Sequence, residues 1–325
     1  MKSNTPYMVA DIGGTNSRFG LVTKCDGNEF EITQQQKYPS IQFSGIQQAT
    51  QHYIESLNGI SFSGACLAVA GPIAGNQVHL TNLNWSFSTK QVQESLGLAS
   101  LEIINDFAAY AFAARLVPKQ NLMTLNKGEG IITSPVAVVG PGTGFGAASL
   151  VPFENNYTVV PAESGHMTIA AKSELQLAII NVLSREFSHV CIETVLSGPG
   201  LRNLYRALNQ VEGLNMPELR AAQITEQALI DPNSLAYRTL KLFCLWLGQI
   251  SGDLALGLGA RGGLFLGGGI LIRIIDFLKD SEFMHGFTDK GKLHSYLDAI
   301  PVNLITEGNS ALLGAASWYH SKITS

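Results

Sequence analysis

The sequence predicts an α/β protein of two domains, and three observations carry this prediction. Segments typical of buried strands alternate along the chain with segments typical of helices, and short loops separate them. The length of 325 residues exceeds what one hydrophobic core usually supports. A glycine-rich turn follows an apolar strand in each half, at Gly13–Gly14 and within Gly140–Gly146. The pattern therefore favours two related α/β halves.

The first half opens with an expected β-hairpin. An apolar strand runs into Asp11, the chain turns through Gly13 and Gly14, and a second strand spans Ser17 to Val22. Glycines permit a tight turn and let a ligand approach the backbone N–H groups. An acid two residues before that turn can hold a hydrated metal ion beside a bound anion. A plain hairpin with an aspartate near its turn is the alternative, and the local sequence alone favours it.

Local patterns predict the other elements of the first half. Gly64–Ala70 is a continuous apolar run, which is typical of a buried strand, and Ser88 is expected to cap a helix that ends at Leu96. The remaining elements expected here are helices over Ile41–Leu57 and Phe107–Leu116 and a strand over Leu101–Ile104.

The second half repeats the first in outline. Aligning Thr15 with Thr143 gives, at both sites, an apolar strand, a glycine turn, a threonine and an apolar segment with glycine. Each site is followed at a distance by a strand that ends in glycine, at Gly71 and at Gly267–Gly269. Two turns of phosphate size suggest a nucleotide held between the domains. The other elements expected here are strands over Pro135–Val139, Ala147–Val151, Tyr157–Val160 and Gly263–Gly267, helices over Glu174–Phe187 and Asn233–Gly259, and a final helix from a cap at Asn309 to Lys322.

Two other nucleotide-binding patterns fit less well. The P-loop string Gly-x-x-x-x-Gly-Lys-Ser/Thr is absent from the sequence. The run Gly142–Ala147 matches the letters of a dinucleotide-binding turn, and Glu163 follows at a suitable distance. However, a strand rather than a helix is expected after this turn, so no helix N-terminus is available to hold a pyrophosphate. The sequence therefore disfavours a dehydrogenase.

The residues that could act on an acceptor substrate lie in three short segments. Asn105 and Asp106 follow a strand whose carboxyl end is expected to face a ligand, where a carboxylate could accept a proton from a hydroxyl. Asp106 as a helix N-cap is the alternative, and the local sequence slightly favours it. Glu163, His166 and Glu193 could hold the hydroxyls of a sugar if they are buried.

These three residues also have simpler interpretations. His166 could be a structural histidine and Glu193 a solvated helix residue. A metal site at Glu163 and His166 is disfavoured, because no third ligand has a suitable spacing.

Composition and charge narrow the class of protein. The net charge of −4, without a long run of Lys or Arg, disfavours a nucleic-acid partner. Four scattered cysteines fit a reducing compartment, and the N-terminus lacks the apolar core of a signal peptide, so we expect a cytoplasmic protein. Leu242–Ala260 is strongly apolar but contains Gln249, Asp253 and glycines, which favours a buried helix over a membrane span.

Several of these motifs together carry a family resemblance. They are Asp11–Asn16, Thr81–Asn82 with Trp85, Leu101–Phe107, Gly142–Gly144, Glu163 with His166, Leu196–Leu201 and Gly267–Ile270. Over nearly its full length the chain resembles the bacterial glucokinases of the non-repressor type, within the actin, hexokinase and heat-shock ATPase superfamily. The segment Asn105–Asp106 together with Leu-Ser-Gly-Pro-Gly is the most specific part of the resemblance, whereas Gly-Gly-Thr marks only the superfamily.

The resemblance implies a fold and an activity. The fold would be the two-domain actin-like ATPase (ribonuclease H-like) fold, with the active site in the interdomain cleft. Residues 1–116 plus 307–325 would form the small domain and residues 117–306 the large one. The activity would be ATP-dependent phosphorylation of glucose at its 6-hydroxyl, the first step of glycolysis, by a homodimer. A kinase for another hexose and a non-catalytic sugar sensor are the alternatives.

The resemblance also implies roles for single residues. Asp106 would be the general base, and Asp11 would hold Mg²⁺ through water. The sugar would be bound by Asn105, Glu163, His166 and Glu193. The ATP phosphates would lie between Gly13–Gly14–Thr15 and Gly142–Thr143–Gly144, and Gly267, Gly268 and Gly269 would pass beneath the adenosine. The sequence departs from the family at Ala162 and Ser164, where relatives commonly have glycine, and this leaves the sugar preference open.

Overall fold

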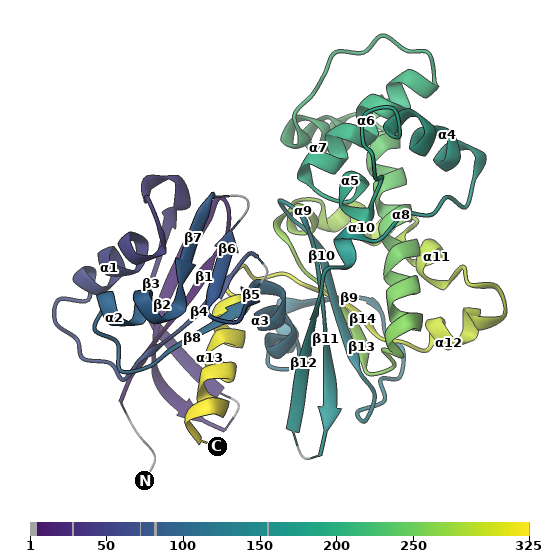
Figure 1. Ribbon diagram of the computed structural model, residues 1–325. Coiled ribbons are helices and arrows are strands. Elements are labelled where there is room, and N and C mark those ends of the chain that lie inside the picture. The colour runs from purple at the N-terminus through teal and green to yellow at the C-terminus, as the bar shows by residue number, and fades with distance from the viewer. Residues whose placement is uncertain (1–4, 28, 72, 81–82, 155, 325) are drawn as a thin grey trace. The chain divides into compact units, whose positions relative to one another are not determined.

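The computed structural model describes residues 5–27, 29–71, 73–80, 83–154 and 156–324. The chain divides into two compact units (Figure 1). The first unit comprises Met1–Asn121 and Glu307–Ser325, and the second comprises Leu122–Thr306. The C-terminal segment thus returns to the unit in which the chain begins.

The first unit is built on a mixed sheet with strand order β3-β2-β1-β4-β8. Its strands are β1 (Tyr7–Ile12), β2 (Asn16–Asp26), β3 (Glu29–Pro39), β4 (Ala65–Val69) and β8 (Leu101–Asn105). The helices of this unit are α1 (Ile46–Ser56), α2 (Thr89–Ser95), α3 (Asp106–Ala113) and α13 (Ser310–Thr324). A small separate sheet contains β5 (Ile73–Ala74), β6 (Gln77–Leu80) and β7 (Trp85–Ser88).

Alternating side chains of β1 supply two hydrophobic cores, one on each face of this sheet. Met8 and Ile12 pack in the core that contains Tyr53 of α1. Val9 packs in the other core, with Ala109 of α3 and residues of α13. Successive side chains of a strand point to opposite faces, so every residue of β1 is buried. This arrangement holds Asp11 at the end of a rigid central strand.

The second unit repeats this topology. Its sheet has the order β12-β11-β10-β13-β14-β9. Its strands are β9 (Leu122–Asn126), β10 (Val136–Pro141), β11 (Phe145–Phe153), β12 (Asn156–Ala162), β13 (Gly263–Leu266) and β14 (Val302–Ile305). In each unit an antiparallel hairpin, β1–β2 or β10–β11, is joined by a parallel strand, β4 or β13. The predicted repeat is confirmed at the level of topology.

The helices of the second unit lie in the chain between β12 and β13 and between β13 and β14. They are α4 (Glu174–Leu183), α5 (Ile192–Val195), α6 (Gly198–Val211), α7 (Ala221–Ile230), α8 (Leu235–Leu258), α9 (Gly269–Arg273), α10 (Ile275–Asp280), α11 (Phe283–Thr288) and α12 (His294–Asp298). Helices α4, α6 and α7 gather beyond one end of the sheet (Figure 1). The apolar helix expected near Leu242–Ala260 is α8, and most of its residues are buried within the unit. None of the helices in the described part of the chain combines the length and the apolar content needed to cross a membrane.

Several predicted elements have different bounds in the structure. Helix α1 begins at Ile46 instead of Ile41, because Gly45 is extended and precedes its first turn. Helix α4 ends at Leu183 instead of Phe187. The cap of Ser88 on α2 is confirmed, since its side chain accepts from the Gln91 N–H. The sequence does not predict the long edge strand β3, because the alternation of Phe30 and Ile32 with exposed glutamates is short and gives way to the polar run Gln34–Lys37.

Candidate active site

Asn105 and Asp106 lie at the junction of β8 and α3. The cap of α3 is Asn105, whose Oδ1 accepts from the N–H groups of Phe107 and Ala108 at 2.9 and 3.1 Å. Its Nδ2 donates to the carbonyl of Gly71 at 3.4 Å. The interpretation of Asp106 as the N-cap is therefore wrong. Asp106 occupies the first turn instead, where the helix dipole favours a negative charge.

Asp11 ends up buried in an ion pair that the sequence did not reveal. Arg18 is its cross-strand neighbour, and Arg18 Nη1 donates to Asp11 Oδ2 at 2.9 Å. Burial raises the pKa of Asp11, while the charge and hydrogen bond of Arg18 lower it. The local arrangement is a buried carboxylate whose charge is balanced by one partly exposed cation.

The turn from Gly13 to Asn16 is anchored by Ser40, another residue that sequence reasoning missed. Gly13 N–H donates to the Asn16 carbonyl at 2.9 Å and closes the turn. The Ser40 hydroxyl donates to the Gly13 carbonyl at 2.7 Å, and the Ser40 N–H donates to the Thr15 carbonyl at 3.0 Å. Ser40 thus holds the turn by two hydrogen bonds to its carbonyl groups, while Thr15 in the turn is exposed.

Tyr110 of α3 lies within electrostatic reach of Asp11 and Asp106. Burial raises the pKa of Tyr110 well above its ordinary value, and the charges of Asp11 and Asp106 raise it further. Arg18 opposes this effect. The sheet register places the two aspartates more directly: β1, β4 and β8 run parallel, with Ile12 opposite Val69 and Val69 opposite Asn105. Asp11 and Asp106 therefore lie at the same edge of the sheet, although they are far apart in sequence.

The second unit gathers its candidate residues around the turn Gly142–Gly144. The Gly142 N–H donates to the Gly144 carbonyl at 2.7 Å, so the turn is tight. The Phe145 N–H donates to Glu193 Oε2 at 2.7 Å. A Cβ on Gly144 would lie 2.4 Å from Glu193 Oε2, so only glycine permits this approach. The interpretation of Glu193 as a merely solvated residue is wrong, because its carboxylate is bound to the turn.

The segment with Glu163 and His166 packs beside the same turn. A Cβ on Gly165 would lie 2.5 Å from the Phe145 carbonyl, so the two backbones nearly touch. Glu163 and His166 are exposed, however, so the burial on which their role as sugar ligands is conditional is not seen in this structure. Glu163 is the N-cap and His166 the last residue of a 3₁₀ turn whose other two residues are buried.

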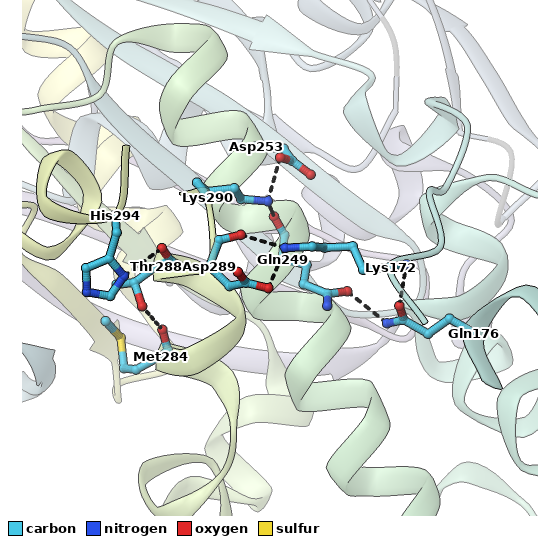
Figure 2. A network of polar contacts seen from close by, with 9 residues as sticks. All are labelled: Lys172, Gln176, Gln249, Asp253, Met284, Thr288, Asp289, Lys290 and His294. Atoms are coloured by element: carbon cyan, nitrogen blue, oxygen red, sulfur yellow. Dashed lines mark hydrogen bonds and ion pairs between the residues drawn. The ribbon is translucent and has the colours of Figure 1, made fainter. Parts of the chain in front are cut away.

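Hydrogen bonds anchor the chain after His166 to helices of the second unit, and Figure 2 shows those made by Lys172 and Gln176. Trp246 of α8 donates to the Ala170 carbonyl at 2.9 Å. The Lys172 ammonium binds the side chain and carbonyl of Asp289. Gln176 of α4 donates to Gln249 of α8 at 2.8 Å inside the unit. These contacts give the exposed Glu163–His166 turn a rigid base.

The glycines expected beneath an adenosine lie beside the end of β10. Gly267 N–H donates to the Val139 carbonyl at 2.9 Å. Gly268 has a φ of +101° and lies against Pro141, where a Cβ would come within 2.3 Å of the carbonyl. In contrast, a Cβ on Gly142 or on Gly269 would meet nothing within 4 Å. Open space at these two glycines fits a nucleotide lying across the backbone.

Comparison with known proteins identifies the family. The family model described as Glucokinase matches residues 8–322. The chain is 42% identical, over 96% of its length and 98% of the relative's, to the glucokinase of Saccharophagus degradans. The chain belongs to the glucokinase family. Glucokinases are enzymes, so this chain is an enzyme.

Solved structures of the glucokinase family agree with the fold. The structure of a glucokinase from an Antarctic psychrotroph has a TM-score of 0.87, 44% identity, and coverage of 98% of this chain and 99% of that one. A glucokinase of the ROK family from Streptomyces griseus, solved with glucose and AMPPNP, has a TM-score of 0.65 at 19% identity and covers 96% and 98% of the two chains. The fold is the actin-like ATPase fold, as predicted.

One motif of the family resemblance, Thr81–Asn82, lies outside the described residues. Of the others, Asn105, Asp106 and Asp11 lie at one sheet edge of the first unit. The second unit holds Glu193, the Glu163–His166 turn, Gly142–Gly144 and Gly267–Gly269.

Proposed function

We propose that this chain transfers the terminal phosphoryl group of ATP to the 6-hydroxyl of glucose. The single observation that carries the proposal is the position of Asp106 at the start of α3, at the same edge of the sheet as Asp11. The names of the full-length relatives support glucose as the acceptor, and the Streptomyces griseus complex supports ATP as the donor. Both units would then act on one pair of substrates.

The chemistry asks the protein mainly for placement and charge balance. Asp106 would orient the sugar hydroxyl and accept its proton as the oxygen attacks the phosphorus. The backbone N–H groups of Gly13–Thr15 and of Gly142–Gly144 would bind the phosphates of ATP. Asp11 fits a hydrated Mg²⁺, because its carboxylate is buried and, among the described residues, its charge is paired with Arg18 alone. A bound Mg²⁺ would neutralise phosphate charge during the transfer.

The sugar would be held by hydrogen bonds from Asn105, Glu163, His166 and Glu193. A sugar that lacks one matching hydroxyl leaves a partner unsatisfied, at a cost of roughly 1–3 kcal/mol. We therefore expect mannose and galactose to be poor substrates relative to glucose. Closure of Glu163 and His166 over the sugar would bury side chains that are now exposed and exclude water.

We also propose that the enzyme works in the cytoplasm as a homodimer and initiates glycolysis, as the family resemblance implies. We further propose that residues 1–116 with 307–325 and residues 117–306 act as its small and large domains. The division of the chain into two units supports this proposal, although the first boundary falls after Asn121.

The proposal is tested by a coupled assay of ADP release with a panel of hexoses, run on the wild type and on Asp106→Asn. The wild type should prefer glucose, and the variant should bind glucose but lose kcat by on the order of 10²-fold or more. A variant that keeps a third of wild-type turnover would refute the role of Asp106. Comparable kcat/KM for glucose, mannose and galactose would show that the assignment of the sugar-binding residues is wrong.

A further inference from the structure

One short segment of the second unit holds both ends of the turn Gly142–Gly144. At one end, the Glu193 carboxylate accepts from the Phe145 N–H at 2.7 Å. At the other end, the Gly198 N–H donates to the Gly142 carbonyl at 2.9 Å. We call residues Glu193 to Gly198, which run from within α5 to the first residue of α6, the α5–α6 junction. Both ends of the expected phosphate-binding turn are therefore hydrogen-bonded to the α5–α6 junction.

The α5–α6 junction is itself rigid. Ser197, which is buried, donates its hydroxyl to the Glu193 carbonyl at 2.8 Å. The same hydroxyl accepts from the Gly200 N–H at 2.9 Å and so caps α6. Because Ser197 ties the backbone of Glu193 to a 14-residue helix, the Glu193 carboxylate has a fixed base from which to reach Phe145.

The contact between Glu193 and Phe145 uses one carboxylate oxygen. Glu193 Oε2 lies so close to Gly144 that a side chain there would displace it. A hydrogen bond from an N–H to a charged oxygen is stronger than a neutral one. A carboxylate has two oxygens, so the other one can accept a sugar hydroxyl while Oε2 stays on the turn.

We propose that Glu193 is a positioning residue that couples sugar binding to nucleotide binding. A sugar hydroxyl bound at one oxygen holds the carboxylate in place, and the other oxygen then holds the phosphate turn in its binding geometry. This inference rests on the proposed function, because it needs Glu193 to bind the sugar. Coupling of this kind is reciprocal, so the nucleotide strengthens sugar binding by the same factor.

The test is calorimetric titration with AMPPNP and Mg²⁺, with and without saturating glucose. Glucose should raise the wild-type affinity for AMPPNP by about 5-fold or more. Glu193→Ala should weaken AMPPNP binding already without glucose, and glucose should then add less than about 2-fold. Melting temperatures near that of the wild type would show that the variants are folded.

Glu163→Ala is the matched control. Glu163 is also a proposed sugar ligand. It differs from Glu193 because the Phe145 N–H at the end of the turn donates to Glu193. This variant should weaken glucose binding, leave sugar-free AMPPNP binding unchanged, and keep the coupling at saturating glucose. Ser197→Ala should reduce the coupling although Ser197 is placed on neither substrate, and Ser197→Thr should restore it.

The outcomes separate this inference from the proposed function. If the wild type phosphorylates glucose but Glu193→Ala binds AMPPNP as tightly as the wild type, the inference alone is overturned. Equal loss of coupling in Glu163→Ala and Glu193→Ala would overturn it as well. If the wild type binds AMPPNP but neither binds nor phosphorylates glucose, the proposed function fails and the coupling fails with it.

Discussion

Arg18 donates a hydrogen bond of 2.9 Å to the carboxylate of Asp11 across the hairpin of β1 and β2. Only 12% of the Asp11 side chain is exposed, against 29% for Arg18. Burial raises the pKa of Asp11 even though Arg18 opposes the shift. When folding raises the pKa of an acid, the folded protein loses stability as the pH rises above the ordinary pKa of that acid. The negative charge of Asp11 at neutral pH therefore costs stability.

We expect Asp11→Asn to keep or raise stability while it abolishes efficient catalysis. The amide has the same shape and can still accept from Arg18, but it carries no buried charge. Loss of the carboxylate proposed to hold the Mg²⁺ that neutralises phosphoryl charge should lower kcat by on the order of 10²-fold. Melting temperature and turnover at pH 7 measure the two effects. A melting temperature clearly below that of the wild type would show that Asp11 serves stability instead.

Asn105 should contribute separately to stability and to activity. Asn105→Ala removes the cap of α3 and should cost about 1–2 kcal/mol in the free energy of unfolding. Asn105→Asp keeps an acceptor for the Phe107 and Ala108 N–H groups but loses the amide donor to Gly71. The Asp variant should therefore be nearly as stable as the wild type and have a lower kcat/KM. Urea unfolding and the coupled assay measure both, and equal destabilisation by Ala and Asp would contradict the cap.

Gly314 should tolerate no side chain. A Cβ there would lie 1.7 Å from the Ala109 carbonyl, where α13 packs against α3. We expect Gly314→Ala to cost about 1–3 kcal/mol or more and to reduce turnover, because α3 carries Asp106. Gly257→Ala in α8 is the control: a Cβ there meets nothing within 4 Å, and alanine should stabilise the helix by about 0.5–1 kcal/mol. Similar melting temperatures for the two variants would contradict this packing.

The pair Lys172–Asp289 should make a small, pH-dependent contribution to stability. The hydrogen bond from Lys172 lowers the pKa of Asp289 below its ordinary value of 3.8. Such a carboxylate stabilises the fold above that value, and the stabilisation is lost as the pH falls through the lowered pKa. Because 48% of the Asp289 side chain is exposed, solvent screening limits the effect to about 1 kcal/mol or less.

The measurement is the melting temperature of the wild type and of Asp289→Asn from pH 7 to pH 3. The wild type should melt higher at neutral pH, and the two curves should approach one another below about pH 4. A difference that stays constant over this range would show that the contact acts without the charge of Asp289.

The sequence predicted the two glycine turns better than it predicted the contacts around them. Glycine turns after apolar strands indicated both hairpins, because tight turns and buried strands have strong local signals. Ser40 and Arg18 have no such signal, since each acts through a partner on another strand. The same limit explains the wrong cap at α3: Asn and Asp are both good caps, and only the backbone conformation at Asn105 decides between them.

By itself, the sequence determined the alternation of strands and helices, the repeated hairpins and the residue types available for phosphoryl transfer. Tertiary structure alone decided which of those residues meet. Glu193 reaches the Phe145 N–H, and Asp11 and Asp106 share a neighbourhood with Tyr110, through sheet pairings and helix packing that join distant parts of the chain. The physical reason is that periodicity and turn chemistry act over a few residues, whereas hydrogen bonds and charges in a site act across space.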